Sequence, residues 1–309
     1  MATEVCGAPL NTGTPNCVPS SKVDAGIILV SYLADDGTVN SIKTTDTFDT
    51  AYVTAHLNAG NVGSALSKSQ RWYPLMNLKN VIGERAENVT EDIQGVAFNV
   101  KDGVRNYDGT IYGKYATTKL YKALKSRASL RDAYFKVDLD GNLTGNVDSI
   151  TKDINPIRIE SSTFSPRVID PKDANAQALH IKFVVDTRED DSDLGILTGA
   201  TISADLLDIQ GLIDVVGKAS VPTTTTVTLD ATLIYGDAFA LNRFRGAVLA
   251  DFPVYNTTTS LLVVPASVIE TPADSGVYLF TYAAQTSLDV MTINLSRDGF
   301  EMAEVTFTV

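Results

Sequence analysis

Residues that could perform acid–base or nucleophilic chemistry are few in this chain of 309 residues. It contains two histidines, His56 and His180, so a Ser-His-Asp or Cys-His arrangement has few ways to form. His56 lies in a predicted helix and His180 begins an apolar strand, where packing or surface roles are more common than that of a base. The adjacent carboxylates Glu91-Asp92 and Asp190-Asp191 could cleave sugars only beside a cleft rich in aromatic side chains. We predict no catalytic residues and no enzymatic activity.

Motifs that hold cofactors or metal ions are also missing from the sequence. There is no phosphate-binding loop, no dinucleotide glycine fingerprint and no His-Glu-x-x-His pattern. The segment Asp138–Asn142 (DLDGN) resembles the start of a calcium loop. However, Leu143 stands where the loop needs Gly, and Ser149 where it needs a bidentate Glu. We expect a plain hairpin turn there, and neither a cofactor nor a metal ion.

The two cysteines, Cys6 and Cys17, lie in an N-terminal arm, residues 1–23, that is rich in Gly, Pro, Asn and Ser. Such a composition predicts an irregular segment, which either frays or becomes ordered against a neighbouring subunit. A disulfide would close a small loop. A structural zinc site needs four ligands, and both histidines are far away in the sequence. A disulfide, free thiols and, least favoured, a metal site all stay open.

Composition and charge indicate an ordinary globular protein of acidic character. The hydrophobic fraction is 44% and the charged fraction 20%, and Phe and Tyr together number 23, which favours strands. The net charge of −12 divides equally between residues 1–221 and 222–309. A chain this acidic is poorly suited to gripping nucleic acid, although DNA could slide past it without sticking. With no signal-like or membrane-spanning stretch, we expect a soluble protein made in a cytoplasm and no membrane partner.

The central stretch of the chain runs from Trp72 to Gly113. Its pattern predicts a strand, then a polar arm over Glu84–Gln94, then a two-stranded ribbon over Val96–Tyr112 that reverses at a Lys101-Asp102-Gly103 turn. We predict that the arm makes contacts between subunits. Its candidate contact residues are the charged ones, Glu84, Arg85, Glu87, Glu91 and Asp92.

Two short helices are predicted beside the strands. The first is capped by Asp46 or Thr47 and ends before Gly60. The second begins at Thr117 or Thr118, and its lysines form a basic face. That face is either simply solvated or meets an acidic surface of the next subunit.

A boundary is predicted at residues 218–226 (KASVPTTTT), where Pro and Thr form a polar linker. Residues 24–217 are then a β-rich assembly domain. Residues 227–309 read as short strands separated by turns, typical of a β-sandwich. Asp274, Gly276 and Tyr278 match the tyrosine corner of immunoglobulin-like domains, although the antibody cysteine is replaced by Phe280. The expected fold class is mainly β, a tube-like module with one or two flanking helices plus an immunoglobulin-like sandwich.

This layout resembles a tail tube protein of a tailed bacteriophage, such as one infecting Bacteroidetes. The similarity rests on the segment from Cys6 through Asn11-Thr12-Gly13 to Cys17, and on the stretch from Trp72-Tyr73-Pro74-Leu75 to Gly103-Val104-Arg105. The resemblance implies a virion structural protein, assembled in the host cytoplasm, whose copies form rings that stack into a tube.

The resemblance further implies that an arm joins the rings, that other tail proteins are partners, and that DNA passes through an acidic lumen without specific binding. The rings would be hexamers, or trimers of a duplicated module. Two other functions stay open from the sequence. One is another virion component, a head decoration or tail-terminator protein. The other is a carbohydrate-binding surface adhesin.

Overall fold

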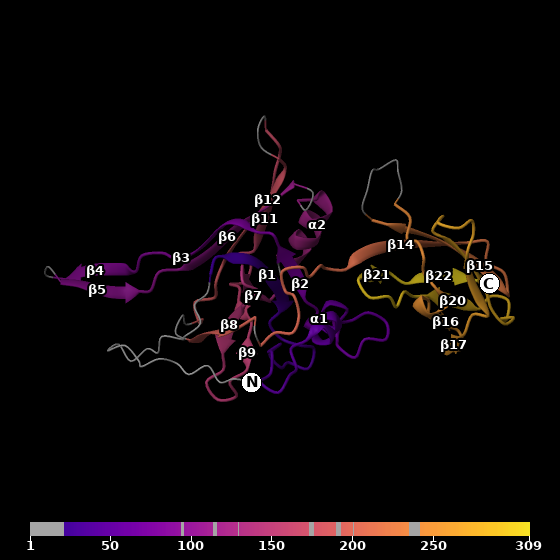
Figure 1. The fold of residues 1–309 in the computed structure, drawn as a ribbon, viewed down its shortest axis with the longest axis horizontal. Helices are drawn as coiled ribbons and strands as arrows, with labels where there is room; N and C mark the ends of the chain where they lie inside the picture. The colour runs from indigo at the N-terminus through magenta and orange to yellow at the C-terminus, as the bar shows by residue number, and fades with distance from the viewer. Residues whose placement is uncertain are drawn as a thin grey trace. The chain divides into compact units, whose positions relative to one another are not determined.

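The computed structural model describes residues 22–93, 96–113, 116–128, 130–172, 176–189, 193–199, 201–234 and 242–309. The protein is mainly β, as predicted, and divides into two compact units (Figure 1). Unit 1 comprises Met1–Val53 and Trp72–Gln210, and unit 2 comprises Thr54–Arg71 and Gly211–Val309. The predicted cysteine pair, Cys6 and Cys17, lies outside the described residues.

Unit 1 is built on two antiparallel sheets. The first has the order β13-β8-β7-β1-β2, with β9 and β10 pairing beside it. Its strands are β1 (Asp24–Ser31), β2 (Tyr73–Met76), β7 (Asp132–Asp138), β8 (Leu143–Val147), β9 (Ile154–Asn155), β10 (Ile157–Arg158) and β13 (Leu194–Leu197). The second sheet has the order β11-β12-β6-β3. Its strands are β3 (Lys79–Arg85), β6 (Arg105–Tyr112), β11 (Ser165–Ile169) and β12 (Ala178–Val184).

Alternating side chains join these two sheets into one core. In β12, Leu179, Ile181 and Phe183 are completely buried, while His180 and Lys182 face the other way. The inward side chains meet those of the first sheet, as the T-shaped contact between Phe183 and Tyr134 shows. The alternation therefore fixes which face of β12 is inside.

The first sheet is covered on both faces. Four consecutive residues of β1, Ile27 to Val30, are fully buried, which happens only when both sides of a strand are packed. One face of this sheet packs on the second sheet. The other face is covered by an aromatic group in which Trp72 lies 5.9 Å from Phe48 and 6.0 Å from Phe135, measured between ring centroids. This group anchors the start of the central stretch in the core.

Two α-helices occur in the described part of the chain, α1 (Thr50–Leu57) and α2 (Thr118–Arg127). The cap of α1 is Asp49, whose Oδ1 accepts from the backbone N of Tyr52 at 2.8 Å, not the predicted Asp46 or Thr47. Thr117 caps α2, as predicted, by accepting from the backbone N of Leu120 at 3.1 Å. Neither helix is long and apolar enough to cross a membrane.

Unit 2 is a sandwich of two sheets with the orders β18-β19-β15-β14-β21 and β17-β16-β20-β22. Its strands are β14 (Ile213–Ser220), β15 (Thr226–Leu233), β16 (Val254–Asn256), β17 (Leu261–Val263), β18 (Ser267–Glu270), β19 (Val277–Thr281), β20 (Val290–Ile293), β21 (Phe300–Met302) and β22 (Val305–Thr308). The order β14-β15-β19-β18 facing β16-β20-β22 is the A-B-E-D against C-F-G order of an immunoglobulin-like domain. Short 3₁₀ turns lie at Lys68–Gln70 and Leu249–Asp251.

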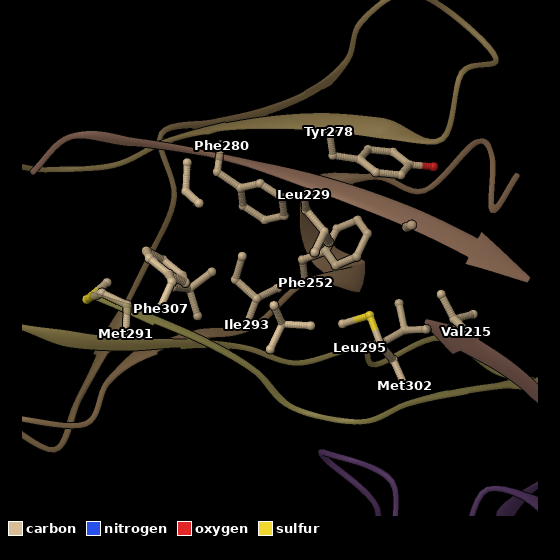
Figure 2. Close-up of a cluster of buried hydrophobic side chains, with 14 of the residues drawn as sticks. Val215, Leu229, Phe252, Tyr278, Phe280, Met291, Ile293, Leu295, Met302 and Phe307 are labelled. Atoms are coloured by element: carbon tan, nitrogen blue, oxygen red, sulfur yellow. The ribbon is translucent and has the colours of Figure 1, made fainter. Parts of the chain in front are cut away.

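The core of unit 2 is filled by large side chains from both sheets. Figure 2 shows Leu229 and Phe280 directed from one sheet toward Ile293 and Phe307 of the other. Phe252 packs edge-on against Phe280 with ring centroids 5.3 Å apart. This core has no tryptophan and no disulfide among the described residues, and the two sheets meet through aromatic and aliphatic packing.

The predicted linker at 218–226 is wrong. Residues 218–220 are the end of β14, whose Lys218 pairs with Asp230 of β15. The threonine run forms the hairpin turn between these strands, where the backbone N of Thr223 donates to the carbonyl of Thr226 at 2.7 Å. Pro and Thr are common in tight turns as well as in linkers, so composition alone did not separate the two.

Unit 2 also contains a segment from the N-terminal half of the chain, residues 54–71. Its last residue, Arg71, has a buried side chain and donates three hydrogen bonds within unit 2. They go to Ala59 O at 2.6 Å, to Asn61 Oδ1 at 2.8 Å and to Glu301 Oε2 at 2.5 Å. Asn61 in turn donates to Phe300 O at 3.0 Å. The sandwich is therefore a discontinuous unit and not a simple C-terminal appendage.

Candidate functional site

The feature that most resembles an interaction site is a two-stranded arm, β4 (Val89–Ile93) and β5 (Val96–Lys101). It continues the pair formed by β3 and β6, and Figure 1 shows it extending away from the sheets of unit 1 as a thin ribbon. Among the described strands, β4 pairs only with β5, and β5 only with β4. Both outer edges of this arm therefore carry backbone groups that no described strand covers.

The sequence predicted the wrong pairing for this region. The ribbon was expected to join Val96–Val100 to Tyr107–Tyr112 through a turn at Lys101-Asp102-Gly103. Instead β5 pairs with β4, as Glu91 opposite Phe98 shows, and β6 pairs with β3 and β12. The segment expected to be a polar arm, Glu84–Gln94, contains the end of β3 and all of β4, which is half of a hairpin. Alternation identifies a strand but does not name its partner.

A tight joint connects the arm to the body of unit 1. The backbone N of Ala86 donates to Val104 O at 2.8 Å, and that of Gly103 donates to Asn88 Oδ1 at 2.9 Å. Arg85 Nη1 donates to Gly103 O at 3.0 Å. A Cβ atom at position 103 would lie 1.6 Å from the carbonyl oxygen of Ala86, so only glycine allows the strands to approach this closely.

The arm exposes large apolar side chains as well as charges. Val89 is 56% exposed, Phe98 50% and Val100 60%. The predicted contact residues Glu84, Arg85, Glu87, Glu91 and Asp92 are all exposed as well. Glu84 and Arg85 end β3, Glu87 lies in the joint, and the last two lie in β4. The structure therefore brings all five onto one ribbon, and the apolar residues are the part that sequence reasoning missed.

The arrangement of Glu91 and Asp92 does not favour acid–base chemistry. Successive side chains of a strand point to opposite faces, and these two residues oppose Phe98 and Ala97 respectively. Their carboxyl groups therefore do not converge on one bond, as glycoside cleavage requires. The other carboxylate pair, Asp190-Asp191, lies outside the described residues.

A charged hollow of about 540 Å³ lies elsewhere in unit 1, and its wall includes Asp132, Arg158, Asp186 and Arg188. These groups are engaged in ion pairs: Asp132 with Arg127, Arg158 with Glu189, and Asp186 with Arg188. Burial raises the pKa of the Asp132 carboxyl even though Arg127 opposes the shift. Apart from Arg131, which also lines the hollow, the charged groups of this wall are neutralised by ion pairs, which fits a structural role.

The calcium-like segment is the hairpin turn between β7 and β8. The carboxylate of Asp138 accepts from the backbone N of Lys22, Asp140 and Asn142, and from Asn142 Nδ2. Burial raises the pKa of Asp138, but these hydrogen bonds outweigh it and leave the pKa below its usual value. No group of three potential metal ligands occurs among the residues that the structure describes.

The predicted tyrosine corner is also different in the structure. Tyr278 is buried in β19, which occupies the E position of the sandwich, whereas a corner tyrosine precedes strand F. Its hydroxyl donates to Phe244 O at 2.8 Å and accepts from the backbone N of Ala247 at 3.3 Å. Asp274 and Gly276 have positive φ of 58° and 68° and form the turn before β19. Tyr278 thus tethers a distant loop.

Comparison with known proteins does not place this chain in a family. No protein-family model matches it, and no curated protein matches it. A solved structure with partial similarity is the N-terminal part of the bacterial S-layer protein SbsC. The two sequences are 15% identical, the matched region covers 30% of this chain and 23% of the S-layer chain, and the TM-score is 0.23. A similarity this weak carries no argument about fold or function.

Proposed function

We propose that this chain is a structural subunit that assembles with copies of itself through the β4–β5 arm. The observation that carries the proposal is an exposed hairpin with apolar side chains and with two edges that no strand in the described part of the chain covers. An isolated two-stranded hairpin is marginally stable in water, and natural proteins usually protect long exposed edges. Docking on a second copy would cover both the edges and the apolar residues of the arm.

The specific assembly that we propose is the tail tube of a tailed bacteriophage, in which rings of this chain stack around a conduit for DNA. The net charge of −12 supports this role, because an acidic wall repels DNA and lets it pass without binding. Unit 1 has two sheets around one shared core, which favours six copies per ring over three duplicated ones. The virion tail is then its location, and neighbouring tail proteins its other partners.

The first test removes the arm without disturbing the body. Arg85 and Arg105 are paired across β3 and β6, so residues 86–104 can be replaced by Asn-Gly, a two-residue hairpin turn. We expect the full-length protein to form hollow tubes of constant width in negative-stain electron microscopy, and the arm-less variant to remain a folded monomer. Tubes from the arm-less variant would exclude the arm as the assembly element.

A single substitution distinguishes a specific contact of the arm from nonspecific association through exposed apolar side chains. Phe98→Ser removes one apolar contact worth about 1 kcal/mol at half burial and should raise the concentration needed for assembly about fivefold. Leu288→Ser is the matched control, because Leu288 is 78% exposed and lies on unit 2; it should leave assembly unchanged. Closed rings without filaments would instead favour a decoration or terminator protein. Lasting monomers at high concentration would refute self-assembly.

A further inference from the structure

The basic charge of this acidic chain is concentrated around α2. Residues 114–131 contain six Lys or Arg and no Asp or Glu, in a chain whose net charge is −12. Within α2, Lys119, Lys122 and Lys125 are exposed, whereas Arg127 is buried and binds Asp132 with Nε–Oδ2 at 2.9 Å. The three exposed lysines are called the α2 lysine row below.

The position of α2 explains why this row faces outward. Leu124 is buried, and Leu120 and Tyr121 pack against the core of unit 1 from the same side of the helix. The lysines follow one another every three residues on the remaining surface. Three residues of α-helix rise about 4.5 Å, so the row spans about 9 Å along the helix.

The arm has the opposite charge. Residues 86–102, which include all of β4 and β5, contain four acidic side chains, Glu87, Glu91, Asp92 and Asp102, and one basic one, Lys101. The four acidic residues are exposed. The extended backbone rises about 3.3 Å per residue, so Glu87 and Glu91 are roughly 13 Å apart, which is comparable with the length of the lysine row.

We propose that the α2 lysine row of one copy receives the acidic arm of a second copy. This inference rests on the proposed self-assembly and names the surface that the arm contacts. Figure 1 shows β4 and β5 projecting away from the part of unit 1 that carries α2, so the arm of the same chain does not cover the row. Opposite charges set the orientation of docking, and the apolar residues of the arm supply the contact area.

The test uses two charge-reversed full-length proteins, K119E/K122E/K125E and E87K/E91K/D92K, together with the protein that carries all six changes. Exposed ion pairs are individually weak, but reversing the charge of one whole side turns attraction into repulsion and should raise the critical concentration for assembly about 100-fold. We expect the six-change protein to assemble near the wild-type concentration. An equimolar mixture of the two single-side variants should do so as well, because each arm then meets a helix of opposite charge.

A second readout does not depend on tubes. Carbodiimide cross-linking of mixed ¹⁴N- and ¹⁵N-labelled wild-type protein should join α2 lysines to arm carboxylates across two copies, as detected by mass spectrometry. Tubes without these cross-links, with K119E/K122E/K125E assembling normally, would overturn the inference and leave the proposed function standing. Cross-links without tubes would support the inference and overturn the proposed tail tube function. Binding of duplex DNA by wild type that is lost in K119E/K122E/K125E would assign the row to nucleic acid and overturn it too.

Discussion

Replacing Arg71 by Ala should detach the segment 54–71 from the sandwich of unit 2. The Arg71 side chain is 3% exposed, and its partner Glu301 is 31% exposed and keeps a second cation, Lys68, at 3.3 Å. Removing one partner of a buried ion pair costs about 3–5 kcal/mol. We take the lower end, about 3 kcal/mol, because Glu301 is partly solvated and retains Lys68.

This loss is large enough to measure for one unit alone. Unit 2 has roughly 120 residues, and an unfolding entropy of about 2.1 cal/mol/K per residue converts 3 kcal/mol into a Tm decrease of about 12 °C. Differential scanning calorimetry should show the decrease in one transition. Hydrogen exchange of peptides from β14 and β21 should assign that transition to unit 2. The fluorescence of Trp72, whose ring packs in unit 1, should report a nearly unchanged transition.

The matched control is Lys68→Ala, which removes the exposed partner of the same carboxylate. Lys68 is 67% exposed, so its loss should cost no more than about 1 kcal/mol, or about 4 °C. Arg71→Lys should fall between the two, because an ammonium group cannot reach three acceptors at once. If Arg71→Ala lowered the Tm no further than Lys68→Ala, segment 54–71 would not be part of unit 2.

Three further predictions concern the arm joint, the loop tether and the β7–β8 turn. Gly103→Ala should force the arm strands apart at Ala86 O, so that limited proteolysis cuts within residues 86–102 while the body keeps its Tm. Tyr278→Phe should cost about 1–2 kcal/mol, measured by urea unfolding, because Phe244 O loses its buried donor. Asp138→Asn should be less stable than wild type above pH 3.8, and the difference should vanish as pH falls through the lowered folded-state pKa, since the protonated carboxyl of wild type then resembles the amide.

Each of these three has an outcome that contradicts it. Thr90→Ala, an exposed change within β4, is the control for the joint, and equal proteolysis of both variants would exclude a steric effect at position 103. Tyr282→Phe is the comparison for the tether, because the Tyr282 hydroxyl also donates to backbone carbonyls of unit 2, those of Thr223 and Thr226. An unchanged stability of Tyr278→Phe would mean that the loop is held by packing alone. If the stability difference between wild type and Asp138→Asn grew as the pH fell, the sign of the pH dependence argued for Asp138 would be wrong.

The sequence by itself determined the class of structure and the surface character of the arm. Period-two alternation, as in Leu179, Ile181 and Phe183, specifies a half-buried strand because successive side chains point to opposite faces. Thr117 specifies the start of α2 because its hydroxyl replaces a missing helical acceptor. The charges of the arm were visible as well, since a run of Glu and Asp without apolar periodicity cannot enter a core.

Only the tertiary structure decided which segments lie together. The partner of β5 is β4 and not β6, because pairing depends on how both strands leave the Gly103 joint, and alternation is the same for either partner. The acceptor of Tyr278 lies 34 residues away, and Arg71 finds Glu301 at a separation of 230 residues. Local patterns specify local conformation, whereas contacts over such separations arise only when the chain has closed around its two cores.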